Sequence, residues 1–177
     1  MNNKNKNNIK KLVFSGLFAS FVFITIVVIP PIPTPTNGYI NFGDSFVNIS
    51  AWLLGPIYGA AAAGIGSAFA DLFLGYTLYA PVTFLIKALM ALASFFIFKA
   101  FSKHSHGLFA RIISASVAEI IMVLGYFAFE CILYGFAGSI IGVPANIIQG
   151  VGGVVIAVVL HEAIFCHIPF FKNHNKL

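Results

Sequence analysis

Charged residues are scarce in this sequence. Only 8% of its 177 residues are Asp, Glu, Lys or Arg, whereas 59% are hydrophobic, and the mean hydropathy is +0.95. An ordinary soluble domain carries roughly 25% charged residues. The composition therefore excludes that class and indicates an integral membrane protein.

Other absences narrow the function. The two cysteines fall in different predicted spans, so neither a disulfide nor a Cys-rich metal site is expected. The phosphate-binding pattern G-x-x-x-x-G-K-[ST] is missing, which excludes ATP hydrolysis by that route. In "HEAIFCH", His161 and Glu162 are neighbours that point about 100° apart on a helix, so no metal site is predicted. No exposed face combines basic and aromatic residues, so no nucleic-acid partner is expected.

Long apolar runs make up most of what is present. Crossing a bilayer takes roughly 17 to 25 apolar residues, and the chain has room for six such helices. We expect an all-α membrane protein with helices at residues 12–30, 45–58, 59–74, 81–101, 109–134 and 143–165. Residues 1–177 form one domain, with a basic tail at 1–11, the six-helix bundle at 12–166 and a second tail at 167–177.

The basic residues indicate the topology. Nine of the ten fall in the N-terminus, the segment after the fourth helix or the C-terminus: Lys4, Lys6, Lys10, Lys11, Lys99, Lys103, Arg111, Lys172 and Lys176. By the positive-inside rule, both termini are cytoplasmic in a multi-pass protein of the cell membrane. The loops on the other side, "PPIPTPTNGYINFGD", "LGYTLYAP" and "GFAGSIIGVP", lack Lys and Arg and are suited to form the mouth of an outward-facing pocket.

Acidic residues inside spans are functional candidates, because a charge in lipid is costly unless it is paired or faces a cavity. All five acidic residues fall within or at the ends of predicted spans: Asp44, Asp71, Glu119, Glu130 and Glu162. Lys87 lies about 9 Å below the outer surface at 1.5 Å per residue, at a depth similar to that of Asp71. We predict an ion pair between the two, and leave open whether it is structural or contacts a ligand.

Two polar stripes predict a binding site. Glu119, Met122, Tyr126 and Glu130 share one face of the fifth helix, and Asn146, Gln149, Gly150 and Gly153 share one face of the sixth. The alternative is that these residues only join helices by hydrogen bonds. The candidate substrate-binding residues are Tyr39, Asn48, Tyr79, Lys87, Glu119, Tyr126, Glu130, Asn146 and Gln149.

The first helix carries small residues four apart. Ser15 and Ala19 form one such pair, and Gly16 and Ser20 form another. This spacing permits close approach of a second helix, which belongs either to this chain or to a partner protein.

The sequence as a whole resembles a known family. Residues "YINFGDSFVNISAWLLGPIYGAAAAGIGSAFADLFLGYTLYAPVTFLIKAL", "AEIIMVLGYFAFECILYG" and "VPANIIQGVGGVVIAVVL" are similar to the substrate-binding S components of energy-coupling factor (ECF) vitamin transporters. The resemblance implies a six-helix fold that captures a vitamin at the outer face and joins an ECF module of one membrane scaffold (T) protein and two ATPases. It also implies that Ser15 and Ala19 contact the scaffold, and that ATP is used only by partners, with no cofactor in this chain.

The subgroup that the sequence resembles imports riboflavin, hydroxymethylpyrimidine or pyridoxine. Pyridoxine or hydroxymethylpyrimidine is the expected substrate, with riboflavin as the alternative. The tyrosines would stack on the ring, the polar stripes would bind its edge, and the loop near Asn37 to Asp44 would close over it. Two other classes remain open: an intramembrane enzyme that uses Glu119 or His161, and a structural membrane scaffold.

Overall fold

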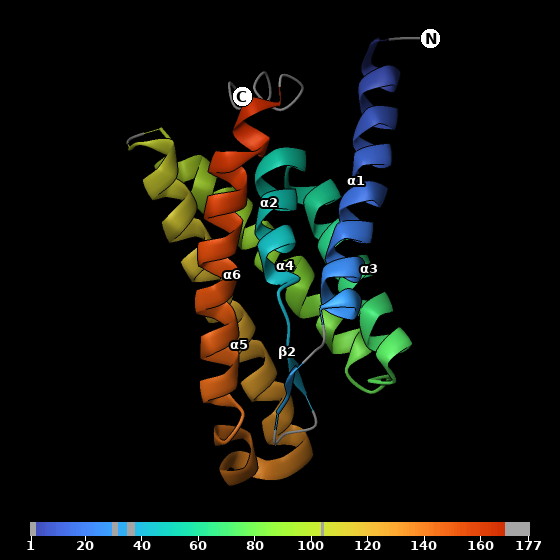
Figure 1. Cartoon of the computed structure of the whole chain (residues 1–177), viewed down its shortest axis with the longest axis vertical. Coiled ribbons are helices and arrows are strands. Elements are labelled where there is room, and N and C mark those ends of the chain that lie inside the picture. The colour runs from blue at the N-terminus through green and yellow to red at the C-terminus, as the bar shows by residue number, and fades with distance from the viewer. Residues whose placement is uncertain (1–2, 30–31, 35–37, 104, 169–177) are drawn as a thin grey trace.

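The structure is a computed structural model that describes residues 3–29, 32–34, 38–103 and 105–168. These residues form a helical bundle with a short hairpin (Figure 1). The predicted tail beyond residue 168, with Lys172 and Lys176, lies outside the described residues, and so does Asn37.

The all-α prediction is confirmed. The helices are α1 (Asn3–Val28), α2 (Asp44–Leu54), α3 (Pro56–Leu74), α4 (Ala80–Phe101), α5 (Gly107–Ile140) and α6 (Val143–Ala163), and a 3-10 turn follows at Phe165–His167. Every one of these helices except α2 is long and apolar enough to cross a membrane.

Helix α2 is an internal element. Its 11 residues span about 16 Å at 1.5 Å per residue, well short of a hydrocarbon core of about 30 Å. All of its residues except Phe46 are buried, so α2 packs inside the bundle. The prediction of six membrane-crossing helices is therefore not confirmed for this one.

Two helix boundaries differ from those expected. The break between the second and third helices lies at Gly55, not near residue 58, because Gly55 adopts a φ of 85° and Pro56 then occupies the first turn of α3. Helix α1 begins at Asn3 and so includes most of the segment expected as a tail. That segment contains no Gly or Pro that would stop a helix.

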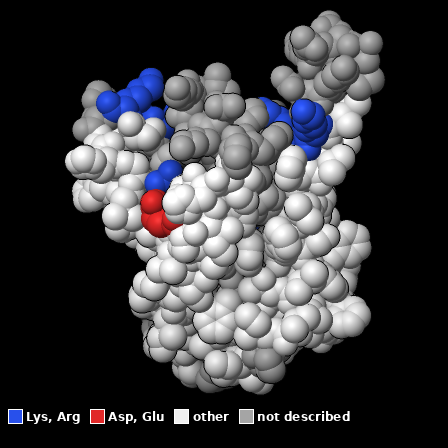
Figure 2. All heavy atoms as spheres, turned by 45° about the horizontal axis from the view of Figure 1, so that its top comes forward, with Lys and Arg blue, Asp and Glu red and all other residues white. Residues whose placement is uncertain are grey.

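The ends of the bundle differ in charge. The first residues of α1, the connection between α4 and α5, and the last turns of α6 lie together at one end, which we call the basic end (Figure 1). Lys and Arg gather there on the face drawn in Figure 2, with one acidic patch directly below them, and the visible surface further down shows no Lys, Arg, Asp or Glu. The hairpin, the α3–α4 turn and the α5–α6 connection lie at the opposite end, called the hairpin end. This separation agrees with the predicted division of the loops.

The hairpin consists of β1 (Ile32–Pro33) and β2 (Tyr39–Ile40). The strands are antiparallel, with Ile32 opposite Ile40 and Pro33 opposite Tyr39. Tyr39 comes shortly before the start of α2 in the chain, and the hairpin holds it beside the ends of α3 and α6 that form the pocket described below.

Small residues let the helices approach closely. A Cβ added at Gly66 of α3 would lie 2.5 Å from the carbonyl oxygen of Ala19 in α1. One added at Gly59 would lie 2.8 Å from Cα of Ala51 in α2. Larger side chains at these positions would separate the helices, so the small-residue run of α3 serves packing within this chain.

Candidate functional site: a tyrosine-lined pocket at the hairpin end

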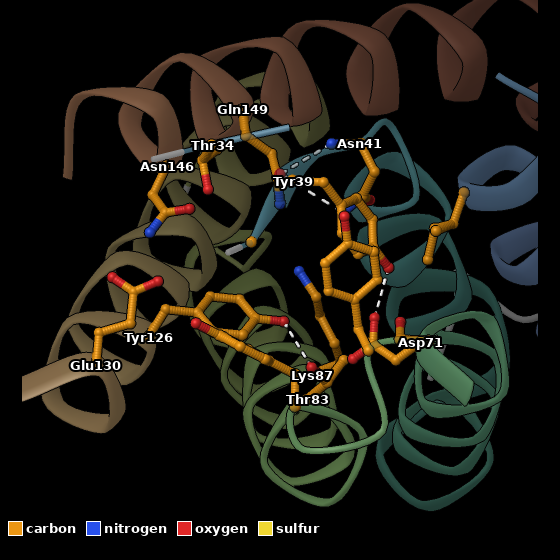
Figure 3. A pocket seen from close by; sticks show the side chains of 15 residues that line it. Thr34, Tyr39, Asn41, Asp71, Thr83, Lys87, Tyr126, Glu130, Asn146 and Gln149 are labelled. Atoms are coloured by element: carbon orange, nitrogen blue, oxygen red, sulfur yellow. Dashed lines mark hydrogen bonds between the residues drawn. The ribbon is translucent and has the colours of Figure 1, made fainter. Parts of the chain in front are cut away.

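A polar cavity opens at the hairpin end of the bundle. The space inside it that water can occupy is about 30 Å³, room for roughly one or two water molecules, so the cavity is nearly closed and must widen to admit a ligand. Side chains from the hairpin and from α1, α3, α4, α5 and α6 line it (Figure 3). The lining residues are Ile26, Thr34, Gly38, Tyr39, Asn41, Ser67, Asp71, Tyr76, Tyr79, Thr83, Lys87, Tyr126, Glu130, Asn146 and Gln149.

Aromatic rings form much of the wall. Tyr39 and Tyr76 lie with ring centroids 4.7 Å apart, and Tyr126 faces them from α5 (Figure 3). Tyr79 is held by an edge-on contact with Phe129, with ring centroids 5.3 Å apart. Burial, together with Tyr134 and Glu130, raises the pKa of Tyr79 above its usual value. Such rings offer flat surfaces on which a planar ligand can stack.

The hairpin is fastened over the pocket at two points. The Tyr39 hydroxyl donates a hydrogen bond to Asp71 Oδ1 on α3 at 2.5 Å. The backbone N–H of Asn41 donates to Gln149 Oε1 on α6 at 2.9 Å. Burial and the neighbouring Asp71 raise the pKa of Tyr39 above its usual value, so this phenol stays a neutral donor. The hairpin thus has the position and contacts of a closed lid.

A buried ion pair forms the floor. Lys87 Nζ of α4 is paired with Asp44 Oδ1 of α2, and their side chains are 1% and 0% exposed. Gln149 Nε2 donates to the other carboxylate oxygen, Asp44 Oδ2, at 2.6 Å. Gln149 therefore joins the lid to the floor, because its oxygen accepts from Asn41 while its nitrogen donates to Asp44.

The predicted ion pair between Asp71 and Lys87 is corrected by this geometry. Both residues line the pocket, but the partner of Lys87 is Asp44. Asp71 instead accepts from Tyr39. The sequence offered no measure of which neighbouring helix each side chain faces.

Lys87 is also placed against an aromatic ring. Its Nζ lies 5.5 Å from the centroid of Tyr126, within the range of a cation–π interaction. The Tyr126 hydroxyl is 3.1 Å from Thr83 Oγ1. These contacts fix the Tyr126 ring at the side of the pocket.

Most of the candidate substrate-binding residues meet at this pocket. Those that line it are Tyr39, Tyr79, Lys87, Tyr126, Glu130, Asn146 and Gln149. Asn48 and Glu119 do not line it. They bond to each other below the floor, where Asn48 Nδ2 donates to Glu119 Oε1 at 3.0 Å.

The separation of Glu119 from Glu130 follows from helix geometry. Eleven residues at 1.5 Å each place them about 16 Å apart along α5, too far for one small ligand to reach both. The glycines of α6 receive Glu119 instead of a ligand: a Cβ at Gly153 would lie 2.9 Å from Glu119 Oε1, and one at Gly150 would lie 3.0 Å from Glu119 Cβ. The lower half of the polar stripe therefore packs helices, and the upper half lines the pocket.

Several lining residues were not predicted. Asn41, Tyr76 and Thr83 belong to loops or helix starts, where no periodicity marks an inward face. Their sole sequence signal is their place in or beside the outer segments that lack Lys and Arg. Asp44 carried a clearer signal, as an acidic residue at the start of an apolar run, but its role as the partner of Lys87 was not identified.

The predicted docking pair on α1 faces inward. Ser15 Oγ donates to the carbonyl oxygen of Tyr58 in α3 at 2.9 Å, and the Ala19 backbone packs against Gly66. The other small pair, Gly16 and Ser20, lies on the exposed side, and nothing lies within 4 Å of a Cβ added at Gly16. Gly16 and Ser20 are the more exposed of the two pairs.

A family model described as "ECF-type riboflavin transporter, S component" matches residues 6–165. The chain belongs to this S-component family. It is also 36% identical over 132 residues to the "Uncharacterized protein in gap 3'region" of Pyrococcus woesei, covering 75% of this chain and 85% of that one.

A solved S component has the same fold. The structure titled "Structure and mechanism of the S component of a bacterial ECF transporter" superposes with a TM-score of 0.68 at 21% identity, covering 91% of this chain and 99% of that chain. An S component for biotin gives a TM-score of 0.48 at 22% identity, covering 92% and 95%. The resemblance expected from the sequence is thus confirmed. As a member of this family, the chain is a membrane-embedded substrate-binding subunit of a vitamin transporter and not an enzyme.

Proposed function

We propose that this S component captures a small heteroaromatic vitamin or precursor, of the pyridoxine or hydroxymethylpyrimidine type. The observation that carries the proposal is the pocket, in which tyrosine rings stand beside convergent carboxylate, amide and hydroxyl groups. A flat ring with hydroxymethyl or amino arms matches this combination, because the rings stack on its faces and the polar groups bond to its edge.

Riboflavin is the second candidate, and the description of the matching family favours it. The small ring is preferred because the tyrosines and polar groups converge within one compact pocket beneath a fastened hairpin. The long isoalloxazine system would need that hairpin to move further.

The hairpin end faces the outside of the cell in this proposal, because the basic end satisfies the positive-inside rule for the cytoplasmic side. A ligand enters when the contacts from Tyr39 to Asp71 and from Asn41 to Gln149 open, and it is enclosed when they re-form. Release into the cell follows reorientation of the whole subunit within a complex whose T protein and two ATPases supply the energy.

The exposed pair Gly16 and Ser20 on α1 is the proposed contact with the T protein. The hydroxyl of Ser20 already donates to the carbonyl oxygen of Gly16 at 3.0 Å, so a partner helix meets no unsatisfied polar group there. Gly16→Leu is expected to prevent co-purification with the ECF module while ligand binding in detergent is unchanged. Retained assembly would exclude this face.

The test of the proposed substrate is mass spectrometry of small molecules released on denaturing the purified protein. Cells are grown in rich medium, and wild type is compared with an Asn146→Leu, Gln149→Leu double variant. Glu162→Gln, at the basic end, serves as the control because it alters a polar side chain that lies outside the pocket.

A single pyridoxine-type or hydroxymethylpyrimidine-type compound retained by wild type and control, and lost from the double variant, would support the proposal. Retention of riboflavin in the same pattern would support the second candidate. If the double variant retained the compound as well as wild type does, the assigned pocket would be wrong.

A further inference from the structure

Carboxylates outnumber cations around the pocket. Asp71 and Glu130 line it, and Asp44 lies directly beneath Lys87. Lys87 is the one basic residue among the described lining residues. These four groups carry more negative than positive formal charge, in an environment where burying an uncompensated charge is costly.

Lys87 is poorly placed to receive an anionic ligand. It is 1% exposed, paired with Asp44, and held over the Tyr126 ring. An anion that reached its Nζ would have to compete with Asp44 and would lie close to the other carboxylates. The positive charge of Lys87 is therefore already used within the protein.

Asp71, unlike Lys87, has a charged group that is available to a ligand. Its side chain is 3% exposed and lines the pocket. One oxygen accepts from Tyr39. The other, Oδ2, is buried and has no hydrogen bond of ordinary geometry among the described residues; the polar group beside this carboxylate is the Thr83 hydroxyl, which is bonded to Tyr126. A buried carboxylate oxygen in this state leaves a strong acceptor available to a ligand.

The aromatic wall adds a second, independent preference. Four tyrosines, Tyr39, Tyr76, Tyr79 and Tyr126, line the same cavity. The faces of aromatic rings carry partial negative charge and attract cations within about 6 Å. Tyrosine faces beside carboxylates favour a ligand that carries positive charge on nitrogen.

We propose that this pocket selects a ring bearing a protonated amine, and that the free oxygen of Asp71 is the group that receives that nitrogen. The inference rests on the proposed function and narrows its substrate class to cationic, amine-bearing heteroaromatic compounds. Rings of the same shape that carry a carboxylate are excluded by repulsion from Asp71 and Glu130.

The test uses three probes that share one ring and differ in one substituent: pyridoxamine with an ammonium, pyridoxine with a hydroxyl and 4-pyridoxate with a carboxylate. Each is titrated calorimetrically at pH 7 into the full-length protein in lipid nanodiscs. Pyridoxamine is expected to bind at least about ten-fold tighter than pyridoxine, because hydrogen bonds to charged groups are the stronger ones. No binding is expected for 4-pyridoxate.

Two variants test whether the preference for pyridoxamine depends on Asp71. In Asp71→Asn, pyridoxamine should lose its advantage over pyridoxine to within about three-fold, since a neutral amide of the same shape replaces the carboxylate. In Glu162→Gln, which removes a carboxylate outside the pocket, the full advantage should remain. Because the readout is a ratio measured on one sample, partial misfolding of a variant does not imitate the result.

Equal affinities for the three probes, a preference for 4-pyridoxate, or an undiminished ratio in Asp71→Asn would overturn the inference. If the three probes fail to bind but riboflavin binds, the inference and the small-ring substrate are wrong, whereas vitamin capture stands. If riboflavin does not bind either, both proposed substrate classes are wrong, and the inference is wrong with them.

Discussion

Two ion pairs tie helices together near opposite ends of this S component, and they differ in what surrounds them. Lys87 and Asp44 are 1% and 0% exposed and connect to the lid through Gln149. Arg111 and Glu162 at the basic end are 10% and 43% exposed, with Nη1 and Oε1 2.8 Å apart. The first pair lies beneath the ligand pocket, and the second joins α5 to α6 at the surface of the bundle.

The comparison shows how location determines what a charge pair contributes. Water reaches Glu162 of the pair at the basic end and screens its charge, so the net effect of this carboxylate on stability is small. The pair beneath the pocket cannot be hydrated, so removing one partner leaves the other buried without compensation. Such a costly arrangement beneath a pocket is easier to explain by ligand positioning than by stability alone.

Breaking the buried pair should have the largest effect. Lys87→Met leaves Asp44 buried with Gln149 as its remaining side-chain partner, and is expected to cost about 3 to 5 kcal/mol of stability and to abolish ligand binding. Thermal unfolding in detergent measures the first effect and ligand titration the second. The double variant Lys87→Met, Asp44→Leu should regain stability without regaining binding. A single variant as stable as wild type would contradict this account of the floor.

Loosening the lid should have an intermediate effect. Tyr39→Phe removes the hydrogen bond to Asp71, which is worth about 0.5 to 3 kcal/mol, and should weaken ligand retention more than it lowers the unfolding temperature. The raised pKa of Tyr39 gives a pH control. The stabilising bond should be fully present below pH of about 10, the unfolded value, and be lost only as pH rises through the higher folded value.

The ratio of the ligand dissociation rates of Tyr39→Phe and wild type should accordingly stay constant between pH 7 and pH 9. Dissociation rates of bound ligand, measured for both proteins at several pH values in that interval, test this expectation. A ratio that falls toward one by pH 9 would mean that the phenol ionises in the folded protein.

Changing the pair at the basic end should have the smallest effect. Glu162→Gln is expected to change stability by no more than about 1 kcal/mol, because Glu162 is 43% exposed and the amide oxygen of Gln can still accept from Arg111, and to leave ligand affinity unaltered. The same unfolding and titration measurements apply. A loss of ligand affinity as large as that of Lys87→Met would contradict the conclusion that only the ion pair beneath the pocket serves ligand binding.

Much of the fold was predictable from the sequence, for physical reasons. Long apolar runs identify membrane helices because lipid requires them, and the uneven distribution of Lys and Arg separates the ends. The segment predicted at 45–58 was already shorter than the roughly 17 to 25 residues of a membrane span, so its length pointed to the internal position of α2, whereas its largely apolar composition did not distinguish a buried helix from a span. Gly55 and Pro56 were visible as a break, but one of several in the same segment.

The site was predictable in part for a related reason. Helical spacing identified Tyr126, Glu130, Asn146 and Gln149 as one side of a pocket. Spacing gives the face of a helix but not which other helix stands opposite, so Lys87 was assigned to Asp71 instead of Asp44. For the same reason, Glu119 was grouped with residues that lie about 16 Å further along the helix.

One irregularity in the longest helix bears on how the protein sits in lipid. Gly135 has a φ of 73° and interrupts α5, and in Figure 1 the last part of this helix turns aside at the hairpin end. A straight helix of 34 residues would be about 51 Å long, well beyond a hydrocarbon core of about 30 Å. Phe136, Ile140 and Ile141, past the break, are 68%, 47% and 58% exposed.

We expect this segment to lie in the headgroup layer of the membrane. There it would fix the depth of the protein in the bilayer, so that the mouth of the pocket stays at the membrane surface. Spin labels at Phe136 and Ile140 should be relaxed more by oxygen dissolved in lipid than by a water-soluble relaxant; the reverse would place the segment in water. When the subunit reorients in the membrane, this segment has to move through the headgroup layer or leave it. The three apolar side chains would therefore contribute to the energy barrier of reorientation.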